Sequence, residues 1–231
     1  MLINDHEIII ERKDVKHINL KVYPDLTIKA SVPKGMQLTT VKRMIISKDN
    51  WIKSQLSKYE DQERMSKRLY ISGEDHYING KRYILNVVDS NTPKVEIKDK
   101  KNVYMYVRKS SSLENKEKIM NQFYKVLLKD KLDIFVQEIE KKIGVNSNSY
   151  SIRKMKNKWG SCNQDSKQLL FNVELGKKSD SEIKYVVTHE LIHLIEKKHN
   201  DNFKRMMYEH CPKWESYHDS LNKLLNSNKI D

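Results

Sequence analysis

Three residues, His189, Glu190 and His193, have the types and the spacing of a site that activates water on a metal ion. On a helix, His189 and His193 lie one turn apart, so both imidazoles leave the same face and can bind one small cation. Glu190 follows the first of these ligands, where a carboxylate can take a proton from water held by the cation. The pattern predicts His189 and His193 as metal ligands and Glu190 as the general base of a hydrolase.

The helix that this site requires is predicted over residues 182–198. Ser179 and Glu182 have the spacing of a capping box at its start. Lys197 and Lys198 favour the negative end of a helix. The helix also has a broad apolar surface, made of Ile183, Val186, Val187, Leu191, Leu194 and Ile195. We therefore expect the two histidines to be polar residues on a helix surface that is otherwise apolar and buried.

His199 is the predicted third ligand. In a continuing helix it would lie about 9 Å along the axis from His193, too far to share a metal, so the helix must end near Lys198. The run His199–Asn202 is typical of a turn, which would let the chain reverse there. The residues leave three alternatives for the third position: Glu215, on a later helix, and His210 and His218.

Length and composition bound the class of protein. A chain of 231 residues with 38% hydrophobic content can bury a core. Cys162 and Cys211 give no disulfide framework, and no apolar run approaches the roughly 18 residues that a membrane span needs. Residues 1–12 carry three acidic side chains and do not have the pattern of a signal peptide. We predict a cytoplasmic protein without a membrane partner.

The formal net charge of +13 is compatible with binding to nucleotides, nucleic acid or acidic proteins. Lysine is spread through nearly every segment, however, and no clustered basic patch is apparent. This distribution favours a solvated lysine-rich surface.

Residues 1–110 are predicted to form an N-terminal β-rich α+β region with antiparallel strands. Alternating apolar residues around Pro24–Asp25 indicate a hairpin over residues 18–32, and residues 39–65 have helical periodicity with an interruption near Asp49. Asn79–Gly80 is a pair preferred in two-residue hairpin turns. Further strands are expected at residues 95–97 and 103–107.

Residues 111–231 are predicted to form the metal-binding catalytic domain, with the polar run Lys109–Ser112 as the boundary. A long helix over residues 119–143 should end at Gly144. Two short strands, at residues 150–156 and 168–175, should follow, joined by a loop over residues 159–165. The metal helix comes next, and the tail should form two helices broken at Pro212.

A family resemblance rests on residues of the C-terminal half. They are Arg153–Lys156, Trp159-Gly160-Ser161-Cys162, Asn172, the run Tyr185–Leu194, His199, Phe203, Pro212 and Trp214. With these residues the chain resembles the YgjP-like metallopeptidase family, which is related to the SprT-like zincins. The resemblance implies a zincin-like core of long helix, small sheet and metal-binding helix, a third histidine ligand, and metal-dependent hydrolysis, normally proteolysis. Lys177–Lys178 departs from the family, which commonly has a proline there.

Four residues are predicted to line the substrate site because the family resemblance falls on them: Trp159, Ser161, Cys162 and Asn172. Trp159 could instead fill the core behind the metal helix. No sequence feature pairs Cys162 with a base, so we expect it to line a cleft rather than act as a nucleophile. The residue that stabilises the oxyanion stays open among Arg153, Tyr208 and Tyr217.

The predicted function is that of a zinc-dependent metallopeptidase that binds one Zn²⁺ per chain and acts on polypeptides. Imidazole sites also accept nickel, copper or iron. One alternative is a metal-dependent nucleotide phosphohydrolase, because the same activated water can attack phosphorus. Another is a nucleic-acid-associated protease that is active only when docked.

Overall fold

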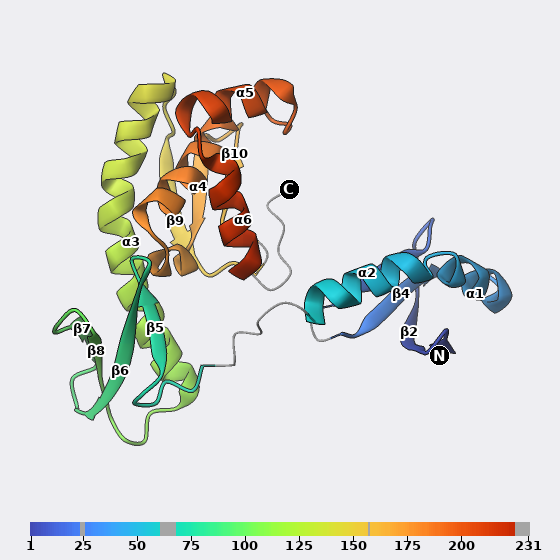
Figure 1. Cartoon of the computed structure of the whole chain (residues 1–231), viewed down its shortest axis with the longest axis horizontal. Helices are drawn as coiled ribbons and strands as arrows, with labels where there is room; N and C mark the ends of the chain where they lie inside the picture. Colours follow the sequence, from blue (N-terminus) through green and yellow to red (C-terminus); the bar gives the residue numbers. More distant parts are fainter. Residues whose placement is uncertain (24–25, 61–67, 157, 225–231) are drawn as a thin grey trace. The chain divides into compact units, whose positions relative to one another are not determined.

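The computed structural model describes residues 1–23, 26–60, 68–156 and 158–224 (Figure 1). The chain divides into two compact units, one within Met1–Met65 and the other within Ser66–Leu221. Both contain helices and strands, which confirms the α+β class. No helix among the described residues has the length and apolar character to cross a membrane. The predicted turn at Pro24–Asp25 and the end of the predicted helix at residues 61–65 lie outside the described residues.

The first unit is a four-stranded sheet followed by two helices. Its elements are β1 (Leu2–Ile3), β2 (His6–Lys13), β3 (Asn19–Val22), β4 (Ile28–Pro33), α1 (Leu38–Ile46) and α2 (Asp49–Glu60), with strand order β1-β2-β4-β3. The antiparallel pairing of β3 with β4 is confirmed. The sheet also contains a parallel pair that was not predicted, because β3 lies at the sheet edge and leaves the earlier strand β2 to pair with β4 in parallel. Ile28, Ala30 and Val32 alternate towards the buried core of this unit.

The second unit begins with a sheet of the same topology. It consists of β5 (Asp75–Ile78), β6 (Lys81–Asp89), β7 (Lys94–Ile97) and β8 (Asn102–Val107), in the order β5-β6-β8-β7. The β6–β8 pair is parallel, like β2–β4, and Val95 opposite Met105 corresponds to Leu20 opposite Ala30. The first hairpin of each sheet turns through two residues with positive φ, Asn4–Asp5 and Asn79–Gly80. The chain thus contains one four-stranded module twice.

The second copy of this module belongs to the same compact unit as the predicted catalytic domain. The amide nitrogens of Asn79 and Gly80 donate to the carbonyl oxygens of Gly176 and Lys177, at 3.2 and 3.0 Å. A Cβ at Gly80 would lie 3.0 Å from the Cβ of Ser179. The hairpin tip therefore fits closely against the residue that begins the histidine-bearing helix. The polar run Lys109–Ser112 is a loop within this second unit.

The remaining elements have the predicted order of long helix, small sheet and histidine-bearing helix. They are α3 (Leu113–Ile143), β9 (Ser149–Arg153), β10 (Gly160–Asn163), β11 (Gln168–Asn172), the 3₁₀ helix η1 (Val173–Lys177), α4 (Asp180–Ile192), α5 (Asp201–His210) and α6 (Trp214–Leu224). α3 ends at Gly144 in the left-handed conformation, as predicted, and packs along α4 and η1 (Figure 1). The predicted loop between the two strands contains a third strand, β10, at the edge of the order β10-β11-β9.

His76 on β5 is a buried titratable group, with 3% of its surface exposed. Its Nδ1 lies 3.5 Å from the hydroxyl of Tyr124, and its Nε2 lies 3.4 Å from a carboxylate oxygen of Glu74. Burial, and then the charge of Arg68, lower the pKa of His76 to about 4, and these effects outweigh the opposing effect of Glu74. The folded chain therefore favours a neutral His76.

This burial predicts a loss of stability in acid. Between pH about 6.5 and about 4 the unfolded chain binds a proton at His76 that the folded chain does not, so the free energy of unfolding should fall by about 3 kcal/mol as the pH is lowered through this window. Urea unfolding measured at several pH values should show a smaller fall for His76→Gln than for the wild type. The matched control is His17→Gln, at an exposed position, which should follow the wild type. If the free energy of unfolding of His76→Gln fell with pH as steeply as that of the wild type, the prediction would be contradicted.

Candidate metal centre

A local interaction lies at the start of α4, the helix that carries the motif, and a contact from another segment lies at its end. At its start, the predicted capping box is confirmed: the Ser179 hydroxyl accepts from the amide of Glu182 at 3.3 Å, and the Glu182 carboxylate accepts from the amide of Ser179 at 2.9 Å. The helix ends at Ile192, earlier than the predicted end near Lys198. At this end the side-chain amide of Gln164, from outside the helix, donates to the carbonyl oxygen of His193.

The early end of α4 lets His199 return to the two helical histidines. The Nε2 atoms of His189, His193 and His199 lie 3.1–3.2 Å from one another. Three nitrogens bound at about 2.0–2.1 Å to one tetrahedral zinc ion would be roughly 3.3 Å apart. The three imidazoles therefore form a triangle of the size that a single ion requires.

The hydrogen-bonding capacity of these rings also fits a metal. The Nδ1 of His193 lies 3.0 Å from the carbonyl oxygen of Glu196, which can only accept, so Nδ1 carries the hydrogen and Nε2 presents a lone pair. Neutral imidazoles have one N–H each, so three mutually adjacent Nε2 atoms cannot all be satisfied by one another. Burial lowers the pKa of both His189 and His193, which favours the neutral form that binds metals.

Phe203, near the start of α5, forms a wall of the histidine cluster. Its ring centroid lies 5.0, 4.8 and 4.6 Å from those of His189, His193 and His199, and 3% of its surface is exposed. The ring limits the rotation of all three imidazoles and keeps water from this side of the site. α5 is positioned by its own cap, in which the Asn200 side chain accepts from the amide of Phe203 at 3.0 Å.

The other residues considered for the third ligand lie outside this cluster. Glu215 accepts a hydrogen bond from the Tyr208 hydroxyl at 2.6 Å, and His218 lies 3.3 Å from Asp219. His210 is the last residue of α5. Among the described residues, the group of side chains close enough to share an ion is His189, His193 and His199.

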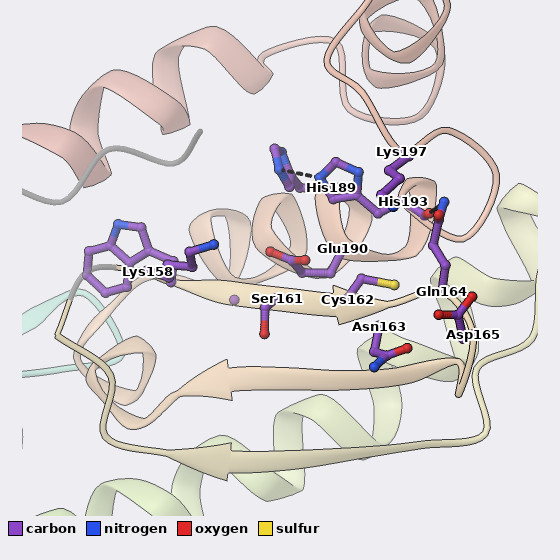
Figure 2. A pocket seen from close by; sticks show the side chains of 12 residues that line it. Lys158, Ser161, Cys162, Asn163, Gln164, Asp165, His189, Glu190, His193 and Lys197 are labelled. Atoms are coloured by element: carbon purple, nitrogen blue, oxygen red, sulfur yellow. Dashed lines mark hydrogen bonds between the residues drawn. The ribbon is translucent and has the colours of Figure 1, made fainter. Parts of the chain in front are cut away.

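Glu190 is buried between α4 and β10, with 4% of its surface exposed (Figure 2). Burial raises the pKa of its carboxyl group to about 8, and the charge of Lys158 opposes this effect. A Cβ at Gly160 would lie 2.6 Å from Oε1 of Glu190 and 2.7 Å from its Cγ. The absence of a side chain at Gly160 is therefore what allows the carboxylate to occupy this place.

We expect Gly160→Ala to displace Glu190 without removing a histidine. Because the added methyl group would overlap the carboxylate, peptide cleavage should fall by roughly 100-fold, the effect of a displacement of about 1 Å in a reacting group. Zinc content, measured by elemental analysis, should stay at the wild-type level. Gly35→Ala is the matched control, because no atom lies within 4 Å of its added Cβ. Wild-type activity in Gly160→Ala would show that Glu190 does not need its observed position.

A pocket of about 430 Å³ opens beside Glu190 and the histidines (Figure 2). Its lining includes three of the four predicted substrate-lining residues: Trp159, Ser161 and Cys162. On β10 the Cys162 side chain points towards α4 and that of Ser161 points the opposite way, as successive residues of a strand do (Figure 2). Burial, together with the charge of Glu190, raises the pKa of Cys162 to about 11, which keeps the thiol protonated and agrees with a lining role.

Asn172, the fourth predicted lining residue, lies outside the pocket lining and has no exposed surface. Its side chain bonds the preceding loop instead. It donates to the carbonyl oxygens of Met155 and Lys158, at 3.0 and 2.8 Å, and accepts from the amides of Met155 and Glu174, at 3.3 and 3.2 Å. Asn172 is therefore a positioning residue for the loop before β10.

Sequence reasoning missed several residues of the pocket. They are Lys158, Asn163, Gln164, Asp165 and Lys197. Gly160, which also lines the pocket, offered a signal, since a glycine can mark a close approach of another group to the backbone. Lys158 offered none, because 44 lysines and arginines are spread along the chain.

Two solved structures of metallopeptidase zymogens are similar to part of the chain. Abylysin of Pyrococcus abyssi is 17% identical with a TM-score of 0.40, over 43% of this chain and 99% of that chain. Jannalysin of Methanocaldococcus jannaschii is 24% identical with a TM-score of 0.36, over 41% of this chain and 90% of that chain. No sequence among curated proteins matches the chain.

The family comparison covers most of the sequence. The family described as YgjP-like, metallopeptidase domain, matches residues 16–224, a range that contains the complete histidine cluster, Glu190 and the pocket. The range also includes most of the first unit, so the match is not limited to the motif. The chain therefore belongs to the YgjP-like family of metallopeptidase domains.

Proposed function

We propose that this metallopeptidase is a mononuclear zinc enzyme in which His189, His193 and His199 hold the ion and Glu190 is the general base. The observation that supports this most directly is the triangle of Nε2 atoms, 3.1–3.2 Å on each side, next to a buried carboxylate. Zinc is the ion that most often combines with three imidazoles and an open fourth position. When bound, it would supply Lewis acidity to the carbonyl group and to water.

Glu190 and the apolar residues around the site have separate roles in the reaction. Glu190 takes a proton from the attacking water and returns it to the leaving amine when the carbon–nitrogen bond breaks. Its burial makes the carboxylate a stronger base than an exposed one, because the pKa of a desolvated carboxyl group is raised. Phe203 and the apolar residues of α4 exclude bulk water from around His189, the buried ligand.

We assign this catalytic role to residues 111–231, which contain all of the ligands, the base and the pocket. The preceding strands β5–β8 then have a supporting role, since the β5–β6 hairpin bonds to the segment before α4. A cytoplasmic setting is part of the proposal, and it is supported by the two free thiols of Cys162 and Cys211. The substrate is proposed to be an extended polypeptide.

Incubation of the purified full chain with an unfolded polypeptide tests this function. We expect cleavage that stops when a chelator removes the metal and returns when zinc is added in stoichiometric amount. Nickel, copper and iron should be added in parallel to compare their ability to restore cleavage. Nucleoside triphosphates, incubated under the same conditions, test the phosphohydrolase alternative. Chelator-sensitive phosphate release without peptide cleavage would overturn the proposal.

A further inference from the structure

The loop that leads into β10 places Lys158 at the rim of the metal pocket. Its carbonyl oxygen accepts from the Asn172 side chain at 2.8 Å, and the next carbonyl, of Trp159, accepts from the Asn172 amide at 2.8 Å. Trp159 itself is 2% exposed. The backbone of Lys158 is therefore held on a buried framework while its side chain remains exposed.

The Lys158 side chain extends towards the carboxylate of Glu190 (Figure 2). Both residues line the same pocket, so the ammonium group and the carboxylate face one cavity. Lys197, the other cationic residue of the lining, lies beside His193, away from Lys158.

Among the described residues, none forms a hydrogen bond or an ion pair with the Lys158 ammonium group that would hold it away from the pocket. The three residues considered earlier for the oxyanion are placed differently. Arg153 ends β9, the Tyr208 hydroxyl donates to Glu215, and the Tyr217 ring packs against Tyr185. None of the three belongs to the described pocket lining.

We propose that Lys158 is a catalytic residue, whose ammonium group donates a hydrogen bond to the carbonyl oxygen of the peptide bond that is cleaved. This inference rests on the proposed function. As water adds to the carbonyl carbon, an oxygen–carbon bond forms, the π pair moves onto the carbonyl oxygen, and Glu190 takes the proton. As the carbon–nitrogen bond breaks, that pair re-forms the double bond and Glu190 protonates the amine. Lys158 keeps its protons and stabilises the negative oxygen in between.

Lys158→Met in the full zinc-loaded chain tests this role. Because the contact strengthens only as charge develops, kcat should fall by roughly 100- to 1000-fold while KM changes little. Lys158→Arg, which keeps a cationic donor, should recover part of the loss. The matched control is Lys156→Met, on the same loop and exposed, which should cleave at the wild-type rate. Zinc content should be unchanged in all three variants.

Binding of a phosphinic peptide, which carries a tetrahedral anionic centre, supplies a second readout. Its affinity should fall in Lys158→Met in parallel with kcat/KM, whereas a purely structural role would not produce this correlation. Wild-type kcat in Lys158→Met, a rise in KM alone, or a loss of zinc or of thermal stability would each overturn the assignment. If the wild-type chain itself cleaved no peptide, the proposed function would fail. That result is distinct from the results that would overturn the role of Lys158, because those require a wild-type chain that cleaves peptides.

Discussion

Replacing Glu190 by glutamine is expected to lower kcat for peptide cleavage by about 10³-fold, within the range contributed by a general base. Glutamine has the same shape but cannot accept the proton from water. The variant should retain its zinc, because Glu190 is separate from the three imidazole nitrogens that form the ligand triangle. Steady-state kinetics on a fluorogenic peptide, together with elemental analysis of the purified protein, measure both quantities.

The stability of the metal-free protein should hardly change in Glu190→Gln. Burial raises the pKa of this carboxyl group to about 8, so near pH 7 the substitution exchanges one neutral group for another. Glu215→Gln serves as the matched control, because that carboxylate bonds to Tyr208 away from the site, and it should retain wild-type kinetics. Full activity with full zinc content in Glu190→Gln would remove Glu190 from the mechanism.

Replacing His199 by alanine is expected to weaken zinc binding by more than roughly 100-fold, since even residues that only support a ligand contribute about 10- to 100-fold. The two helical nitrogens, 3.2 Å apart, would remain as a two-ligand site. Competition with a chromogenic chelator of known affinity measures the change. Cleavage at subsaturating zinc should fall in proportion to the occupied fraction.

Two further variants separate His199 from the residues that compete with it for the third position. Glu215→Ala and His210→Ala remove side chains that lie outside the histidine cluster, so both should bind zinc with wild-type affinity. Tight zinc binding in His199→Ala combined with weak binding in Glu215→Ala would instead identify Glu215 as the third ligand.

The helices show how far periodicity alone can be used. The apolar pattern predicted α3 and its end at Gly144, because both depend on residues within a few positions of one another. It did not specify which apolar residues are buried. Ile134 is 63% exposed, whereas Leu128 and Leu132 are fully buried. Which side of an apolar helix is buried depends on α4 and η1, which pack against it from later in the chain.

The strands show a similar limit. The Asn79–Gly80 turn was predictable because its conformation depends on two adjacent residues with positive φ. The parallel pairs β2–β4 and β6–β8, and the repetition of the whole module, were not predicted. Each parallel pair joins strands that are separated by another strand in the sequence, and local alternation does not specify such a partner. The strand β10 was predicted as a loop for the same reason: Gly160–Asn163 are extended because they pair with β11.

The sequence by itself determined the helix α4, its capping box and the placement of His189, Glu190 and His193, because these depend on contacts one helical turn apart. Only the tertiary structure decided that Gln164 bonds to the end of the helix, that Gly160 makes room for Glu190, and that Lys158 faces the pocket. Each of these contacts joins the β10 segment to α4. Such contacts depend on packing between segments distant in the chain, which local spacing cannot specify.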